Sequence, residues 1–132
     1  MTNGLSTYNI DTMELYHVSS KYMGDEVMLK PRIPIGQSLA EYHSPYKNVA
    51  RICCSDTITK CLSGITSMHA QKTMHVYKPI GRLVIDWDSP RNACDDWEDT
   101  DECWIIEPTK FKYLYSIEVD INTLTYKRIK TN

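Results

Sequence analysis

Short runs of apolar and β-branched residues recur along the chain, and most of them alternate with polar residues as strands do. Bounded by turn-forming residues, they predict strands at residues 13–18, 48–54, 73–77, 82–85, 103–106, 112–119 and 124–129. In the run from 112 to 119, every second residue from Tyr113 to Val119 is expected on one face of its sheet. The pattern therefore predicts a protein in which strands dominate.

One segment follows the helical period instead. Ser55 and Asp56 favour a helix start, and apolar side chains follow at positions 58, 62 and 65. We expect this helix to end near His69. Strands before and after one clear helix predict the α+β class.

The remaining segments are predicted as edge or irregular structure. Residues 1–12 have no periodicity and are expected to form a loose lead-in. Residues 27–35 contain two prolines, which lack the backbone donor of a ladder, so an edge segment or an ordered loop is predicted there rather than a central strand. Residues 37–47 and the acidic run 86–101 are predicted as exposed loops.

Composition narrows the class of protein. A chain of 132 residues predicts one domain, residues 1–132, which needs neither metal nor disulfides to bury a core. Its formal net charge of -2 gives no general attraction to nucleic acid or to an anionic membrane. No apolar run has the length of a membrane span and the N-terminus lacks the features of a signal peptide, so we expect a cytosolic (cytoplasmic) protein. The five cysteines, an odd number without repeated spacing, are then expected as free thiols.

Candidate chemistry begins at the ends of two predicted strands. His17 lies near the end of the first strand, and Glu102 precedes the apolar strand 103–106. Where such strand ends meet, an imidazole and a carboxylate can grip a sugar diol, and the carboxylate can stabilise positive charge developing on an anomeric carbon. The alternative is a structural histidine at a strand end, in an interaction domain that keeps His17 and Glu102 far apart.

Other chemistries have less support. The acidic run does not match the spacing of an EF-hand, and the cysteines and histidines lack zinc-site spacing, so we expect no metal. A cysteine nucleophile with His17 as its base has no supporting motif. Basic residues around the second strand, among them Arg32 and Arg51, are candidates for contact with a diphosphate.

Three segments together resemble the ADP-ribosyltransferase superfamily, in the branch that includes poly(ADP-ribose) polymerases and the small rifampin ADP-ribosyltransferases. The first, residues 15–19, reads Leu-Tyr-His-Val-Ser and is similar to the family's Leu-(Tyr or Phe)-His-Gly-(Ser or Thr) strand. The second begins at residue 51 as Arg-Ile-Cys-Cys-Ser-Asp and resembles its Gly-Ile-Tyr-Phe-Ala-Asp strand with the helix after it. The third begins at residue 102 as Glu-Cys-Trp-Ile-Ile-Glu and resembles its Glu-Tyr-Ile-Val-Tyr-Asp segment.

The resemblance implies an ADP-ribosyltransferase-like fold of two packed, mainly antiparallel sheets with one or two helices, and NAD bound between the sheets. His17 would hold the ribose next to nicotinamide, with support from Ser19. The backbone of Val18 would face the nicotinamide amide. Glu102 would orient the ribose and stabilise the oxocarbenium-like transition state as nicotinamide leaves.

The second segment departs from the family at an important position. Together with Arg32, it would add Arg51, Cys53 and Ser55 to the nucleotide site. Cys53 stands where the family has the tyrosine that stacks on nicotinamide, and Val18 stands where it has glycine. The candidates for a replacement aromatic shelf are Tyr16, Tyr42, Tyr46 and Trp104.

The function implied is a mono-ADP-ribosyltransferase that uses NAD to modify a protein or other macromolecule. Small stand-alone members of the superfamily include phage and mobile-element proteins that modify host machinery, such as anti-CRISPR ADP-ribosyltransferases, so an anti-defence role is one expectation. The acidic run 86–101 would then recognise a basic target or serve as a lid.

Two alternatives stay open. The first is a non-catalytic module that sequesters an ADP-ribose-like nucleotide, or binds and inhibits a partner protein, which Cys53 favours. The second is an RNA 2'-phosphotransferase, a less close resemblance. Those enzymes share the fold but use His and Arg rather than Glu, so Glu102 and the slightly acidic net charge argue against it.

Overall fold

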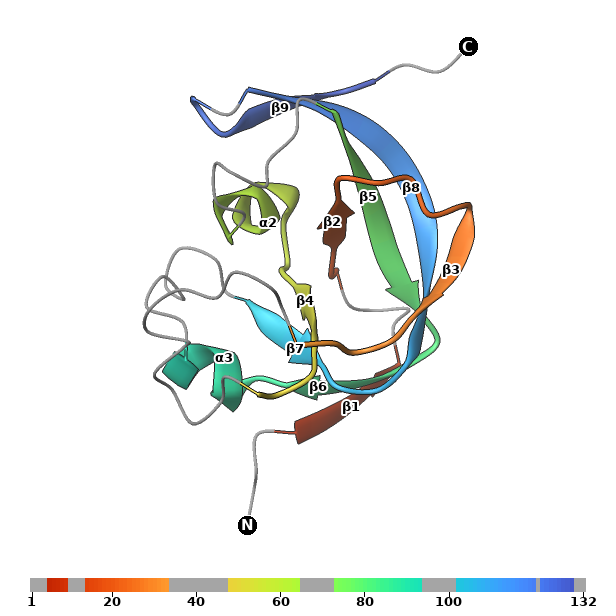
Figure 1. The fold of residues 1–132 in the computed structure, drawn as a ribbon, viewed down its shortest axis with the longest axis vertical. Helices are drawn as coiled ribbons and strands as arrows, with labels where there is room; N and C mark the ends of the chain where they lie inside the picture. Colours follow the sequence, from red (N-terminus) through yellow and green to blue (C-terminus); the bar gives the residue numbers. More distant parts are fainter. Residues whose placement is uncertain are drawn as a thin grey trace.

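Two sheets of antiparallel strands and two short helices make up the fold (Figure 1). The computed structural model describes residues 5–9, 14–33, 48–64, 73–93, 102–120 and 122–129 of the chain. Within these ranges the predicted α+β class is confirmed, and strands dominate as the alternation of apolar residues indicated.

The first sheet has four strands in the order β1, β6, β7 and β4. They span Leu5–Asn9 (β1), Arg82–Asp86 (β6), Cys103–Ile105 (β7) and Ile52–Cys54 (β4), and all neighbours are antiparallel. β1 falls in the segment predicted as a loose lead-in, and that prediction is wrong for residues 5–9. Their own sequence pattern is too short to indicate a strand, and backbone pairing with β6 makes them one.

The second sheet has the order β2, β5, β8 and β3, and β9 also pairs with β8. Its strands span His17–Ser19 (β2), Thr73–Ile80 (β5), Thr109–Asp120 (β8), Glu26–Leu29 (β3) and Thr125–Arg128 (β9). β3 is an edge strand beside β8, as the prolines that follow it predicted. The predicted loop 37–47 lies outside the described residues.

β5 runs directly into β6, and this connection carries the chain from the second sheet to the first. Residues 78–80 were expected in the joining loop but belong to β5, and Gly81 alone makes the turn, with a positive φ of 89°. β2 begins at His17, opposite Tyr77, and does not extend alongside Pro79. At Pro79, β5 therefore has a ladder partner on one side only, which is why a proline is tolerated there.

β8 contains an irregularity that the alternation of its residues did not reveal. Val76 of β5 pairs with Tyr115, but the next residue, Tyr77, pairs with Tyr113, so Leu114 is an extra residue on β8. The bulge reverses the alternation, and Tyr113 packs on the core cluster between the sheets while Tyr115 packs on the cluster beneath α2. The prediction that Tyr113 shares a face with Tyr115 and the residues after it is therefore wrong.

The first helix, α2 (Ile58–Gly64), begins later than Ser55. Thr57 precedes it, and the Thr57 Oγ1 atom accepts a hydrogen bond from the Lys60 backbone N–H at 3.1 Å, as an N-cap residue does. The predicted helix end near His69 lies outside the described residues.

The second helix, α3 (Asp88–Ala93), lies where the acidic loop was predicted, so that prediction is wrong for residues 88–93. The Asp86 carboxylate accepts hydrogen bonds from the backbone N–H groups of Asp88 and Ser89, at 3.1 and 3.0 Å. These two bonds satisfy backbone donors in the first turn of α3. A run of charged residues in the sequence does not predict such a helix start. Residues 94–101 lie outside the described residues.

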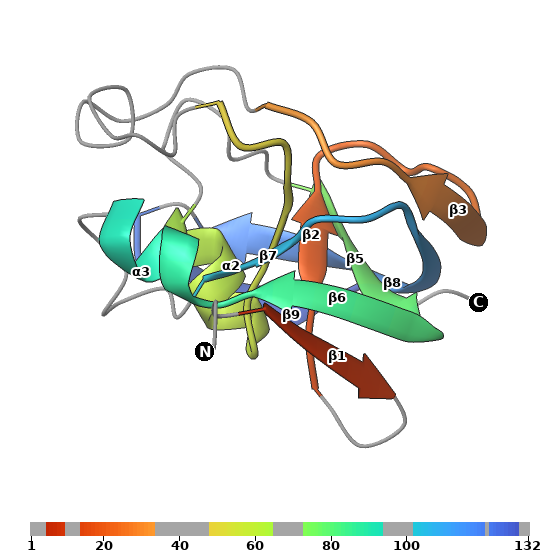
Figure 2. The same ribbon diagram turned by 90° about the horizontal axis from the view of Figure 1, so that it is seen from below.

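Two clusters of buried side chains hold these elements together. One lies between the sheets, where Leu83, Ile85 and Cys103 of the first sheet meet Tyr77 and Phe111 of the second. The other lies between α2 and the second sheet, and its buried members are Val18, Ile58, Leu62, Met74, Val76, Ile117 and Val119. In both ribbon views α2 and α3 lie on one side of the molecule and β3 on the opposite side (Figures 1 and 2).

Two further findings concern the cysteines and the lengths of the helices. Four cysteines are described, and Cys53, Cys54, Cys61 and Cys103 all carry free thiols. α2 and α3 have seven and six residues, so neither helix of the described ranges is long and apolar enough to cross a bilayer.

Candidate functional site

The three segments that carry the predicted chemistry meet at β4. On one edge β4 pairs with β7, with Cys53 opposite Trp104 and Cys54 opposite Cys103. On the other edge, Ser55 exchanges backbone hydrogen bonds of 2.8 and 3.1 Å with Tyr16, the residue before β2. The segments around His17, Cys53 and Glu102 therefore lie side by side, with β4 in the middle.

His17 completes the edge of β4 that β7 leaves open. The His17 Nδ1 atom lies 2.9 Å from the Cys53 carbonyl oxygen. In an antiparallel ladder every second residue directs its backbone groups to the same edge, so the imidazole takes a strand neighbour's place between Arg51 and Ser55. The ring also stands edge-on to Phe111, with the centroids 5.7 Å apart. His17 thus joins the two sheets.

The same hydrogen bond defines the chemistry that His17 offers. A carbonyl oxygen only accepts, so Nδ1 carries the hydrogen, and in the neutral ring Nε2 is an acceptor. Burial lowers the pKa of His17 from its usual 6.5; the nearby Arg32 charge acts in the same direction, and the bond to the Cys53 carbonyl opposes them. At neutral pH His17 is therefore an uncharged group with a hydrogen-bond acceptor at Nε2, which suits a ligand hydroxyl.

The two residues after His17 differ in what they present. The Val18 side chain is buried in the cluster beneath α2, so only its backbone is left to contact a ligand. The Ser19 hydroxyl accepts a hydrogen bond from the Lys21 backbone N–H at 3.1 Å, which shapes the turn after β2. Val18 in place of glycine is accommodated because its side chain points toward α2 rather than toward the side that His17 occupies.

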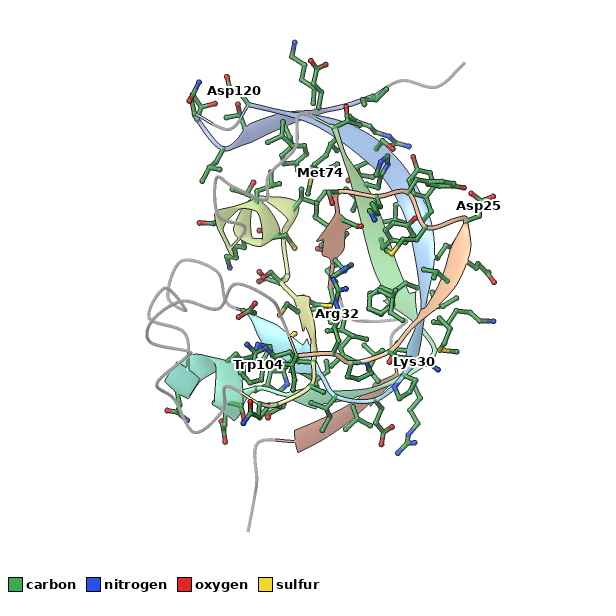
Figure 3. The ribbon with its side chains drawn as sticks, in the orientation of Figure 1. Asp25, Lys30, Arg32, Met74, Trp104 and Asp120 are labelled. Atoms are coloured by element: carbon green, nitrogen blue, oxygen red, sulfur yellow. The ribbon has the colours of Figure 1, made fainter. Side chains whose placement is uncertain are left out.

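The two predicted diphosphate ligands have different surroundings. Their backbones pair, with hydrogen bonds of 2.9 and 3.1 Å between Arg51 and Arg32. The Arg32 side chain is exposed, lies close enough to lower the pKa of His17, and is seen beside β4 in Figure 3. Arg51 is only 3% exposed, and its guanidinium carbon lies 3.8 Å from the centroid of the Trp104 ring. Arg32 is therefore better placed to contact a ligand bound at His17.

Trp104 is a stronger candidate for the replacement aromatic residue than the motifs alone indicated. It is fully buried in β7, lies directly opposite Cys53, and packs against the half-buried Cys53 side chain. Its Nε1 atom has no hydrogen-bond partner among the described residues. Of the aromatic residues considered as a replacement shelf, Trp104 is the one on the strand next to Cys53, while Tyr42 and Tyr46 lie outside the described residues. The signal was present as an aromatic residue at the second position of a short apolar strand.

Glu102 is half-buried and immediately precedes β7, at the end of that strand that pairs with Cys54. Because Tyr16 and β7 flank β4 near this point, the segment just before β2 and the start of β7 are about two strand spacings, or ~10 Å, apart. Burial raises the pKa of Cys61 to about 12, hydrogen bonds from Ser55 oppose the shift, and the carboxylates of Asp56 and Glu102 add to it. Glu102 is therefore close enough to Cys61, a residue of α2, to influence its pKa.

Three of the thiols around this site, those of Cys54, Cys61 and Cys103, are poor nucleophiles. Burial is the main cause that raises the pKa of Cys54 and of Cys103 above the usual range. Together with Cys61, they remain protonated at neutral pH, whereas the thiolate is the reactive form. His17 bonds to the Cys53 carbonyl rather than to its sulfur. Within the described ranges, no group of three His, Cys, Asp or Glu side chains is arranged to hold a metal ion.

Comparison with protein-family models, with curated proteins and with solved structures finds no match to this chain.

Proposed function

We propose that this chain is an ADP-ribosyltransferase with the fold of that superfamily, which uses NAD to modify a protein or other macromolecular target in the cytoplasm. The observation that carries the proposal is the meeting of three segments, remote in sequence, around β4. They are the segments that resemble the family's His, Tyr and Glu motifs, and they occur in the same order along the chain. NAD, or an ADP-ribose-like nucleotide, would bind beside this junction.

His17 and Glu102 have the two main roles in the proposed reaction. The acceptor at His17 Nε2 receives a hydrogen bond from a hydroxyl of the ribose next to nicotinamide, while its Nδ1 remains bonded to Cys53. The bond from the anomeric carbon to the nicotinamide nitrogen breaks, and nicotinamide leaves with the bonding electron pair. The Glu102 carboxylate stabilises the cationic ribose, and the target's nucleophile attacks the anomeric carbon and loses its proton.

Trp104 is a candidate to compensate for the missing tyrosine. Cys53 cannot stack on a nicotinamide ring, and loss of a stacking aromatic weakens base binding by ~1–3 kcal/mol. Trp104 adjoins Cys53 across the ladder, but its ring is covered by Arg51 on one face. NAD affinity below that of a stacked site is the expected consequence.

Nicotinamide release from NAD tests the proposal. Glu102→Gln removes the carboxylate charge and keeps the side-chain size, so release should fall by ~100-fold or more, as for loss of a preorganised transition-state contact. Glu107→Gln is the matched control, because Glu107 is exposed and lies beyond the other end of β7. Wild-type protein that releases no nicotinamide with any cell lysate as a source of targets, or equal rates for the two variants, would refute the enzymatic function.

Cys53 also favours a second function, a non-catalytic module that sequesters an ADP-ribose-like nucleotide or binds and inhibits a partner protein. The polar junction would then bind the nucleotide without cleaving it. Calorimetry with NAD, ADP-ribose and cyclic ADP-ribose separates the two functions. Binding that leaves every nucleotide unconsumed supports sequestration, whereas consumption of NAD supports the transferase.

A further inference from the structure

A basic patch lies where β5, β8 and β3 run side by side, at alternate positions whose side chains face away from the core cluster between the sheets; Lys78 and Ile80 are half-buried and Lys110 and Lys112 are exposed. Lys78 of β5 lies opposite Lys112 of β8, and Ile80 lies opposite Lys110. The residues between these positions point the other way, since Phe111 and Pro79 are buried in the interior. The patch consists of Lys30, Lys78, Lys110, Lys112, Met28 and Ile80.

Register and exposure place the β3 side of the patch on the same face. Met28 pairs with Lys110, and Glu26 pairs with Lys112. Exposed and half-buried side chains alternate from Glu26 to Lys30, with Glu26, Met28 and Lys30 exposed. Figure 3 shows Lys30 just beyond β3, on the side of the molecule opposite the two helices. The basic patch is therefore one continuous surface across three strands.

Like charges face each other in this patch. Side chains directly opposite on antiparallel strands lie ~5 Å apart, and two lysines in that relation destabilise the sheet. Neither Lys78 nor Lys112 forms an ion pair with another residue of the described ranges, and the one acidic neighbour, Glu26, lies 3.8 Å from the Lys110 ammonium group. The patch thus has an excess of positive charge, in a chain whose formal net charge is -2.

We propose that the basic patch binds an acidic, extended polypeptide segment of a partner protein. Lys110 and Lys112 are two residues apart on one strand, which separates them by ~7 Å, and alternate residues of an extended peptide have the same separation. A segment with acidic residues at alternate positions therefore matches these lysines one to one, with Lys78 beside Lys112 to share a carboxylate. Met28, 54% exposed, and Ile80 supply apolar contact between the charges.

Other anionic partners fit this surface less well. Single-stranded nucleic acid is bound by aromatic rings on which bases stack, and the basic patch contains no aromatic residue. A bilayer surface requires a larger apolar area than two side chains provide. The inference goes beyond the proposed transferase function and does not depend on it, because peptide binding is measured without NAD.

Fluorescence anisotropy with a labelled peptide of alternating Glu and Thr residues tests the inference. The key variant is Lys78→Glu, which reverses one charge and also pairs it with Lys112. We expect peptide binding several-fold to about tenfold weaker than for wild type, as lost and reversed ion pairs at a surface produce. We expect a higher melting temperature for the same variant, because a like-charged pair becomes an opposite-charged one. The higher melting temperature would show that weaker binding does not come from unfolding.

Lys21→Glu is the matched control, since Lys21 is exposed in the loop after β2 and the net charge changes by the same amount. Its peptide affinity should stay near the wild-type value. The inference is overturned if wild-type protein does not bind the peptide, or if Lys78→Glu binds it as well as wild type. It is also overturned if Lys21→Glu weakens binding equally. Tighter, Lys78-dependent binding of an oligothymidine strand or of phosphatidylserine vesicles would reject a polypeptide partner in favour of those ligands.

Discussion

His17 is predicted to stabilise the fold as well as to bind ligand, and substitutions separate its two contributions. His17→Ala removes the hydrogen bond to the Cys53 carbonyl and the ring contact with Phe111. A net hydrogen bond contributes ~1 kcal/mol and loss of the packed ring a similar or larger amount, so the expected cost is ~2–3 kcal/mol. His17→Asn keeps a donor at the position of Nδ1 and loses only the ring contact, so its cost should be ~1 kcal/mol smaller.

The pH dependence of stability provides an independent measure. Burial, aided by the Arg32 charge, lowers the pKa of His17 in the folded protein below its unfolded value of 6.5. The unfolded chain therefore binds the proton more readily. The stability associated with neutral His17 is fully present above the unfolded pKa and is lost as the pH falls toward the lowered folded pKa. The largest slope for one group is ~1.4 kcal/mol per pH unit.

Urea unfolding from about pH 8 to about pH 5 measures both contributions, since a shifted midpoint reports stability at constant slope. Wild type should lose more stability across this range than His17→Asn or His17→Ala, because neither variant has a titratable side chain at position 17. Arg32→Gln should reduce the loss in part, because the charge that opposes protonation is gone. Equal pH dependence for wild type and His17→Asn would refute the linkage to His17. Equal stability of the Ala and Asn variants at pH 8 would refute the contribution of the Cys53 hydrogen bond.

Two further substitutions test how loops are attached to the sheets. The buried Tyr77 hydroxyl accepts a hydrogen bond from the Met23 N–H at 2.6 Å and donates one to the Gly24 carbonyl at 3.1 Å. Tyr77→Phe should therefore cost ~1–3 kcal/mol in urea unfolding, and an unchanged midpoint would contradict this. Asp86→Ala removes the carboxylate that caps α3 and should cost ~1 kcal/mol, whereas Asp86→Asn, which keeps a capping oxygen, should cost less. Equal losses for the two Asp86 variants would argue against capping.

The strand content could be predicted because alternation of apolar and polar residues records which face of each strand is buried. β5, β6, β7, β8 and β9 all overlap the predicted runs. The first residues of helices and strands were harder to predict, since they depend on hydrogen bonds to single atoms. Thr57 rather than Ser55 precedes α2, because Ser55 pairs with Tyr16 while the Thr57 hydroxyl accepts a bond within the helix.

Parts of the candidate site could also be predicted from the sequence, for a different reason. Side-chain chemistry is local, so His17 and Glu102 could be identified as residue types at predicted strand ends, and Cys53 by its place in the segment that resembles the family. The stack of Arg51 on Trp104 could not, because it joins two strands that are far apart in the chain. The same holds for the role of His17 as a neighbour of β4.

The amino-acid sequence by itself determined the class of fold, the main strands and the helix after Ser55, since burial of alternating side chains is a local pattern. Tertiary structure decided everything that depends on a partner across space. Pairing with β6 made a strand of Leu5–Asn9, the bulge at Leu114 reversed the faces of β8, and β4 brought His17 beside Cys53. Backbone hydrogen bonds between remote segments leave no periodic trace in either segment, which is why register and the site became visible only in three dimensions.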